Sequence, residues 1–176
     1  MIFTGFLILV GAQLTAAQKI PIPLAQQLVK DDQYVKEKMQ EENWTIAQLA
    51  GQVNDVKKVD LNGDGSLELI FSGIICGNAN CSTWIYRKNG NRYVQIPFDA
   101  SAIGIEIRKT KTSGYFDISV EGRSSASETE LHIYKFDGSK YEIKECFSKK
   151  FAVVNSKTGK ATVLKTPKIT KINCGS

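Results

Sequence analysis

Two stretches of the sequence recur at a nearly constant spacing, and this recurrence constrains the fold more than any other feature. Residues 65–73 align with residues 114–122 at an offset of 49, and residues 85–93 align with residues 133–141 at an offset of 48. Each copy has a turn, an apolar strand, a loop, a strand ending in Ile-Tyr and a glycine turn. Repeats of almost fifty residues made only of strands are typical of propeller blades. The alternative is that any two β-meanders share this pattern.

The chain changes near Val53 from a helical pattern to short runs of strand-forming residues. Apolar residues between positions 24 and 39 recur every three or four residues, which predicts two short helices with a break near Asp31 and Asp32. A third helix is predicted over residues 43–51, with Asn43 as its N-cap. Strands are predicted at residues 55–59, 67–75, 82–88, 92–96, 103–109, 115–121, 129–135, 140–146, 151–155 and 161–164.

These patterns predict a mainly β fold with short N-terminal helices, in which two propeller-blade-like antiparallel β repeats form an open or curled sheet assembly. Two copies are too few to close a ring of blades, which is why the sheets stay open, curl or are covered by the helices. The expected segments are a signal peptide at 1–17, a helical segment at 18–52, a β-repeat domain at 53–146 with copies 53–101 and 102–146, and a basic hairpin or tail at 147–176.

The first 17 residues resemble a secretory signal peptide. They contain no charged residue, residues 2–10 are apolar, and Thr15 and Ala17 suit a cleavage site before Gln18. No Lys or Arg precedes the apolar run, so an uncleaved anchor and a buried N-terminal strand are the alternatives. We expect an exported protein, in the periplasm or outside the cell, with no transmembrane segment in the mature chain.

The four cysteines, an even number in an exported chain, predict disulfides. Four cysteines allow three pairings. The short Gly- and Asn-rich segment between Cys76 and Cys81 favours a local bridge, which leaves Cys146 to pair with Cys174. A zinc site is the rival interpretation, but the Cys-x4-Cys spacing with no histidine nearby does not favour it.

The strongest local signal is the acidic segment 60–68. Oxygen-bearing side chains recur at every second position of this segment, and Gly65 permits the sharp turn that wraps a loop around an ion. Such an all-oxygen set suits Ca²⁺ better than Mg²⁺. The candidate ligands are Asp60, Asn62, Asp64, Ser66 through its carbonyl, and Glu68.

The segment is not an EF-hand loop, because its twelfth position is Phe71 and not a glutamate. The plain alternative is a set of favourable Asp-Gly and Asn-Gly turns with no ion. Against that alternative, closely spaced acids repel one another without a cation. A bound ion is expected to be structural, because all of its ligands come from one loop.

The pattern Asp-x-Asn-x-Asp-Gly-x-x-Glu, followed by Leu-Ile-Phe-Ser-Gly, resembles the calcium loop of FG-GAP/VCBS-type repeats. The resemblance covers about residues 53–146 and implies a Ca²⁺ ion held between two strands of a blade by the five candidate ligands. The matching positions of the second copy are Lys109, Lys111, Ser113 and Asp117. Because that copy keeps only the last acid, the resemblance implies one bound Ca²⁺.

Other residues carry weaker signals. The chain has a single histidine, His132, which alternates with apolar residues in a strand and has no obvious catalytic partner. Trp84 and Tyr86 share one face of a strand, where core packing is favoured over a binding platform. The loop 124–128 corresponds to the loop 76–81, so the two loops are expected to project from equivalent places.

The charge of the chain is unevenly distributed. The net charge is +5, with 23 Lys and Arg against 18 Asp and Glu. Residues 147–176 contain seven lysines and no acid. These lysines either keep an edge strand soluble or attract an anionic surface or an acidic protein. Nucleic acid is not expected as a partner of an exported chain whose basic segment has no Arg.

The leading hypothesis is an exported, non-enzymatic, Ca²⁺-stabilised β-repeat protein that binds another secreted or cell-surface protein, as an inhibitor or immunity protein does. One alternative is a secreted hydrolase with a carboxylate pair, Glu121 with Glu128 or Glu130, because glycoside hydrolysis needs only two acids. The other is a purely structural surface module. A single histidine argues against Ser-His-Asp, Cys-His and multi-histidine metal chemistry.

Overall fold

A computed structural model describes residues 19–154, 158 and 160–175. The predicted signal peptide at residues 1–17 lies outside this described part. Among the described residues, no helix is both long and apolar enough to cross a membrane.

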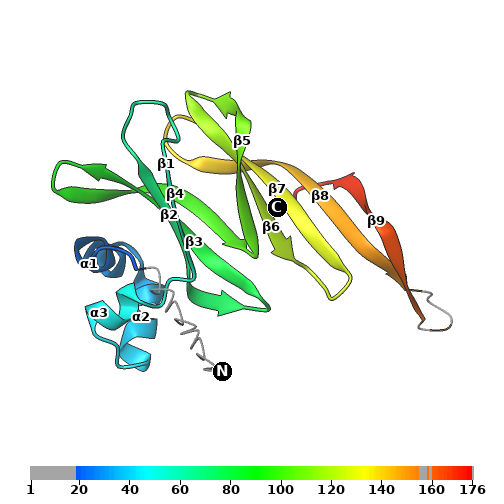
Figure 1. Ribbon diagram of the computed structural model, residues 1–176, viewed down its shortest axis with the longest axis horizontal. Helices are drawn as coiled ribbons and strands as arrows, with labels where there is room; N and C mark the ends of the chain where they lie inside the picture. The colour runs from blue at the N-terminus through cyan, green and yellow to red at the C-terminus, as the bar shows by residue number, and fades with distance from the viewer. Residues whose placement is uncertain (1–18, 155–157, 159, 176) are drawn as a thin grey trace, which may run out of the picture.

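The described chain folds into three short helices and two antiparallel sheets (Figure 1), so the prediction of a mainly β fold with N-terminal helices is confirmed. The second sheet is curled into a half-barrel. The first sheet contains, in order, β1 (Asp55–Val59), β2 (Glu68–Gly77), β3 (Asn80–Asn89) and β4 (Arg92–Ala102). The second contains β5 (Gly104–Thr112), β6 (Tyr115–Arg123), β7 (Glu128–Phe136), β8 (Tyr141–Val154) and β9 (Ala161–Ile172).

Both sheets begin with four strands that follow one another along the chain and pair antiparallel with their neighbours. The tight turns also correspond. Gly90 between β3 and β4 and Gly138 between β7 and β8 both have a positive φ, of 57° and 113°, which glycine adopts without steric cost. The second sheet differs by one added strand, β9, which pairs with β8 at the sheet edge.

The strand pattern near the C-terminus is longer and more continuous than predicted. Residues 140–146 and 151–155 are not two strands; residues 141–154 form the single strand β8. A register shift between Lys150 and Ala152 absorbs the irregularity in the pattern, so a bulge replaces the expected break. The boundary drawn between residues 146 and 147 therefore falls inside β8. β9 is also longer than the predicted 161–164 and runs to Ile172.

The helices are α1 (Ile22–Asp31), α2 (Gln33–Glu41) and α3 (Ile46–Ala50). The predicted break lies at Asp32, whose carboxylate accepts the backbone N–H groups of Tyr34 and Val35 and so caps α2. The predicted cap of the third helix was wrong. Thr45, not Asn43, caps α3, because Thr45 and Gln48 form a reciprocal capping box.

Two cores hold these elements together. The first lies between the helices and one face of the first sheet, and the second lies between the two sheets. On β2, Leu69 and Phe71 face the first core and Ile70 faces the second, so the middle of this strand is covered on both faces. Burial on both faces explains why its sequence is continuously apolar instead of alternating.

Trp84 and Tyr86 belong to the first core and do not form an exposed platform. They are 4% and 0% exposed, and both rings stack against Phe71. Their polar ends reach the helices, where Trp84 Nε1 donates to Asp32 Oδ2 and the Tyr86 hydroxyl donates to Asp31 Oδ2, each at 2.9 Å. These two strand residues therefore fix the helical segment on the sheet.

Candidate functional site

The acidic segment 60–68 connects β1 to β2, and its last residue, Glu68, is the first residue of β2. Gly63 and Gly65 have φ values of 85° and 86°, a left-handed conformation that favours glycine. The loop thus has two left-handed residues only two positions apart, between Asn62 and Ser66.

Backbone N–H groups of this loop donate hydrogen bonds to several of its side-chain oxygens. The two carboxylate oxygens of Asp60 accept from Gly63 at 2.6 Å and from Gly65 at 2.9 Å. Asp64 accepts from the backbone N–H of Ser66 at 2.7 Å and from the Asn62 amide at 2.8 Å. These hydrogen bonds, first that of Asn62, hold the pKa of Asp64 below its usual value.

Glu68 is the buried end of the acidic segment, with 2% of its surface exposed. Its Oε2 accepts the backbone N–H of Leu61 at 2.8 Å. Burial raises the pKa of the Glu68 carboxyl, and the negative charges of Asp64 and Asp60 raise it further, against the opposing effect of the Leu61 N–H. A carboxylate in this position gains from any nearby positive charge.

The second sheet supplies one such charge to the loop. Lys111 on β5 donates to the backbone carbonyl of Asn62 at 3.0 Å, and its ammonium also lies 4.3 Å from the centre of the Phe116 ring. Lys111 is the residue that aligns with Asn62 in the sequence repeat. The segment that aligns with the acidic loop thus has a lysine in place of Asn62, and its ammonium group contacts the acidic loop itself.

The donor atoms of the loop have the chemistry for Ca²⁺, because they are all oxygens. In the described part of the chain, no three His, Cys, Asp or Glu side chains gather closely enough to hold a metal ion. A cation at this loop would therefore depend on the Asn62 amide and the Ser66 carbonyl in addition to carboxylates. Asp60, Asn62, Asp64, Ser66 and Glu68 remain the residues that could hold it.

Asp117 corresponds in the second copy to Glu68 and is also buried, with 3% exposure. Its Oδ2 accepts the Thr110 hydroxyl at 2.6 Å, whereas its Oδ1 has no hydrogen-bond partner among the described residues. The two residues that the sequence repeat aligns are thus both buried carboxyls, one at the start of β2 and one inside β6.

Both predicted disulfides are present. Cys76–Cys81 joins β2 to β3 next to their connecting turn, and Cys146–Cys174 ties the residues after β9 to β8. No free cysteine remains in the described part of the chain. Two disulfides indicate an oxidising, extracytoplasmic setting.

The loop closed by Cys76–Cys81 and the loop at residues 123–126 line an open cavity of about 600 Å³. Asn80 joins the two loops, because its amide donates to the Arg123 carbonyl at 3.0 Å and its Oδ1 accepts the Arg123 N–H at 2.7 Å. Tyr34 of α2 lines the same cavity and is 62% exposed. The two loops do line one site, although their link is Asn80 and not a repeat-equivalent pair.

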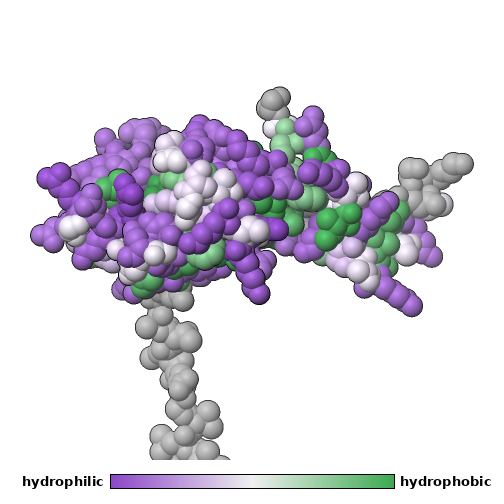
Figure 2. Space-filling view, turned by 90° about the horizontal axis from the view of Figure 1, so that it is seen from above, coloured by the Kyte–Doolittle hydropathy of each residue, from purple (hydrophilic) through white to green (hydrophobic). Residues whose placement is uncertain are grey.

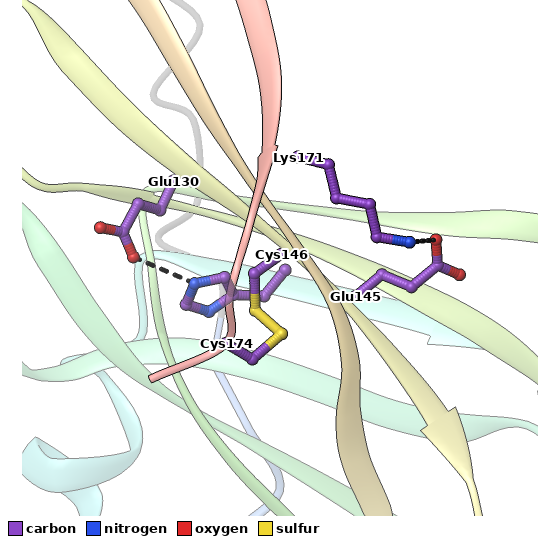
Figure 3. The surroundings of a disulfide bond; sticks show 6 residues. Glu130, Glu145, Cys146, Lys171 and Cys174 are labelled. Carbon is purple, nitrogen blue, oxygen red and sulfur yellow. Dashed lines mark hydrogen bonds and ion pairs between the residues drawn. A yellow bond between two sulfur atoms is a disulfide. The ribbon is translucent and has the colours of Figure 1, made fainter. Parts of the chain in front are cut away.

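This cavity continues along the molecule into two smaller ones. A hollow of about 150 Å³ shares Asn80, Arg123 and Ser124 with it, and reaches Glu130 and His132. A third hollow, of about 390 Å³, shares Glu130 and His132 and ends at the disulfide Cys146–Cys174. Figure 3 shows this disulfide with Glu130 in its surroundings. We refer to the three together as the loop groove.

His132 lies in the middle of the loop groove, where its Nε2 is 3.1 Å from Glu130 Oε2. This pair comes from alternate residues of β7, which place both side chains on one face of the sheet. The sequence located His132 on a strand, but did not indicate its carboxylate partner or the groove.

Of the carboxylates named for the hydrolase alternative, Glu130 lines the loop groove, whereas Glu121 and Glu128 are engaged elsewhere. Glu121 accepts the Thr129 hydroxyl at 2.7 Å and pairs with Lys149 at 3.0 Å. Burial acts to raise the pKa of Glu121, but Thr129 and Lys149 outweigh it and leave this pKa below the usual value. Glu128 accepts the Ser148 hydroxyl. Glu121 is therefore held ionised, which does not suit a general acid.

Sequence reasoning placed Asn80 in one of the two projecting loops, but it missed Tyr34 and Arg123 as groove residues. A usable signal existed for Arg123, which stands next to the loop that corresponds to residues 76–81. The sequence pattern counted Tyr34 with the apolar residues of the helices, and only the structure shows that it is exposed.

Comparison with protein-family models, with curated proteins and with solved structures gives no match for this chain.

Proposed function

We propose that this protein is an exported, non-enzymatic binding protein that holds an extended segment of another secreted or cell-surface protein in the loop groove. The observation that carries the proposal is the shared lining of the three hollows, through Arg123 and Ser124 in one step and Glu130 and His132 in the next. A ligand that follows such a path is long and narrow, as an extended peptide is.

The lining supports a peptide ligand. Side-chain amides and hydroxyls supply hydrogen bonds, Arg123 supplies a positive charge, and the exposed Tyr34 supplies an amphipathic ring at one end. A disulfide borders the groove at each end. The disulfides restrict the backbone before the ligand binds, so binding costs less conformational entropy. The ion-paired Glu121 supports binding over hydrolysis.

The proposal includes a structural Ca²⁺ ion at the acidic loop and a relationship to FG-GAP/VCBS-type repeats. Support for the ion comes from the buried Glu68, whose raised pKa reflects a carboxylate that lacks a close positive partner. Support for the relationship comes from the two successive four-strand meanders and from the position of the acidic loop between β1 and β2. The ion would stabilise the base of the first sheet, away from the loop groove.

Site-specific photo-crosslinking tests the function. A photoreactive residue replaces Tyr34 or Ser125 in the groove, or Tyr93 on β4 as the control position, and the mature protein is irradiated in its native secretions. We expect one protein species to be captured from Tyr34 and Ser125 and not from Tyr93. Peptide mapping should place both crosslinks on one continuous segment of that species.

A second variant tests the role of charge. Arg123→Glu should reduce capture at both groove positions by about 10-fold, because one charge-assisted hydrogen bond contributes roughly 1.5–3 kcal/mol. Equal capture from Tyr93, or capture that Arg123→Glu leaves unchanged, would overturn the proposal.

A further inference from the structure

We infer that the projecting end of the β8–β9 hairpin is a second interaction surface, which docks on an anionic lipid bilayer. We call this surface the hairpin end and define it by Val153, Lys160, Val163, Lys165, Lys168 and Ile169. It lies on the arm that extends away from both cores in Figure 1. It is separate from the loop groove, so this inference does not depend on the proposed function.

The hairpin leaves part of its positive charge unpaired. Three of its lysines are neutralised by the neighbouring sheet, because Lys149, Lys150 and Lys171 pair with Glu121, Glu128 and Glu145. Lys160, Lys165 and Lys168 form no ion pair with any described residue. The positive charge that remains is therefore concentrated at the hairpin end, where it attracts an anionic surface.

Exposed apolar side chains lie on the same hairpin as these lysines. Val163 is 79% exposed, Ile169 is 58% exposed and Val153 is 53% exposed. Figure 2 shows hydrophobic atoms among hydrophilic ones on the same arm. Large aliphatic side chains with this exposure are unfavourable in water alone, and a surface that combines them with lysines matches the interface of an anionic membrane.

The exposed aliphatic side chains are arranged on both faces of the hairpin. Ala152 pairs with Val163 and Val153 pairs with Thr162, so the two valines lie on opposite faces of the hairpin. A surface for a flat partner would be apolar on one face only. An end that is apolar on both faces can enter the headgroup region edge-on, with the long lysine side chains reaching the lipid phosphates.

A protein partner could in principle add a strand to the exposed edge of this sheet. β9 is the edge strand, but Pro167 has no N–H to donate, and the register of β9 shifts between its pairs with Lys150 and Ala152. Both features hinder pairing with another strand. The edge of β9 is thus protected against strand addition, while its side chains stay exposed.

Vesicle co-sedimentation of the mature protein tests the inference. Vesicles contain phosphatidylcholine alone or a mixture of phosphatidylglycerol and phosphatidylcholine, and soluble heparin serves as a polyanion without a bilayer. We expect binding to the mixed vesicles, weakened by salt, and little binding to phosphatidylcholine alone. The double variant Lys165→Glu/Lys168→Glu should bind the mixed vesicles at least about 30-fold more weakly, from roughly a five-fold effect per lysine removed.

The apolar contribution is tested separately. Val153→Ser/Val163→Ser should weaken binding to the mixed vesicles by about 10-fold, because the variant keeps every charge and loses apolar burial. The matched controls are Val94→Ser on β4 and Lys88→Glu/Lys109→Glu on β3 and β5, which should reduce binding far less. Near-ultraviolet circular dichroism shows that each variant is folded.

Two results would overturn the inference. In one, the valine variant binds mixed vesicles as the wild type does, which means adsorption by charge alone. In the other, the protein binds heparin and not vesicles, which assigns the lysines to an acidic polymer.

Discussion

The indole Nε1 of Trp84 lies 2.9 Å from Asp32 Oδ2, and the other oxygen of the same carboxylate caps α2. Asp32 therefore caps α2 at the break between the two helices and also anchors them to the sheet. The adjacent Asp31 accepts the Tyr86 hydroxyl, and burial, followed by this hydrogen bond, raises the pKa of Tyr86. These hydrogen bonds hold the helices on the first sheet within an otherwise apolar core.

Replacing Asp32 should destabilise the fold through both of its roles. Asp32→Ala removes the cap, at about 1 kcal/mol, and leaves the indole N–H without its acceptor, at about 1–3 kcal/mol. We expect a loss of about 3 kcal/mol in the free energy of unfolding, measured by urea denaturation. Asp32→Asn retains the capping oxygen and should lose less, and Glu37→Ala on the exposed side of α2 is the control. Equal losses for Asp32→Ala and Glu37→Ala would contradict this assignment.

The two disulfides should differ in their contribution to stability. Cys146 and Cys174 are 28 residues apart, whereas Cys76 and Cys81 are 5 apart. In the loop-entropy model, replacing the first pair by serine costs about 3.5 kcal/mol, and replacing the second pair costs about 2 kcal/mol. Urea denaturation of both double variants without reductant measures the difference. A non-reducing peptide map containing a Cys76–Cys146 linkage would refute the pairing.

Calcium should stabilise the protein through the acidic loop. At a Ca²⁺ concentration 100 times the dissociation constant, binding adds about 2.7 kcal/mol to the free energy of unfolding. The melting temperature of the wild type should therefore fall in EGTA, and Asp64→Ala should abolish this difference. An identical melting temperature with Ca²⁺ and with EGTA would reject the ion.

Lys111 allows the same loop to be tested without calcium. Lys111→Met keeps much of the side-chain length but removes the ammonium beside the Asn62 carbonyl, so the calcium-free protein should lose about 1 kcal/mol. Ca²⁺ should then bind more tightly, because a like charge has been removed. Lys109→Met, at an exposed position of the same strand, is the control. Isothermal titration calorimetry measures the affinity, and an unchanged affinity would show that Lys111 does not face the ion.

Glu68 should make stability depend on pH in the absence of calcium. Its pKa is raised in the folded state, so its contribution is present below the unfolded pKa of about 4.3 and is lost as pH rises through the folded pKa. Glu68→Gln keeps an acceptor for Leu61 and removes the charge, so its advantage over the wild type should grow from pH 4 to pH 7. Urea denaturation across this range, with Glu106→Gln as a control for charge loss, tests the sign. An advantage that shrinks toward pH 7 would mean that Glu68 is stabilised as an anion.

The elements that the sequence predicted correctly depend on local chemistry. The glycine turns at Gly90 and Gly138, the break between the helices at Asp32 and the short spacing of Cys76 and Cys81 each depend on a few neighbouring residues. The cap of α3 was also readable, because Thr45 and Gln48 have the spacing of a capping box. The error of choosing Asn43 came from composition alone.

The groove and the Lys111 ammonium beside the acidic loop were not predictable from local patterns. Arg123 and Asn80 are 43 residues apart, and Lys111 and Asn62 are 49 apart. Each contact depends on how the two sheets pack, which a single sequence does not reveal. The continuous β8 was missed for a different reason, because a bulge and a turn leave similar marks in a sequence.

Lys111 and Asn62 occupy equivalent positions in the two copies, and they contact each other. Two identical subunits make contacts of this kind across a twofold axis. Within one chain such a contact is intramolecular, so it forms at every protein concentration and needs no self-association. The two aligned positions also differ in chemistry, because one supplies a backbone carbonyl and the other an ammonium group.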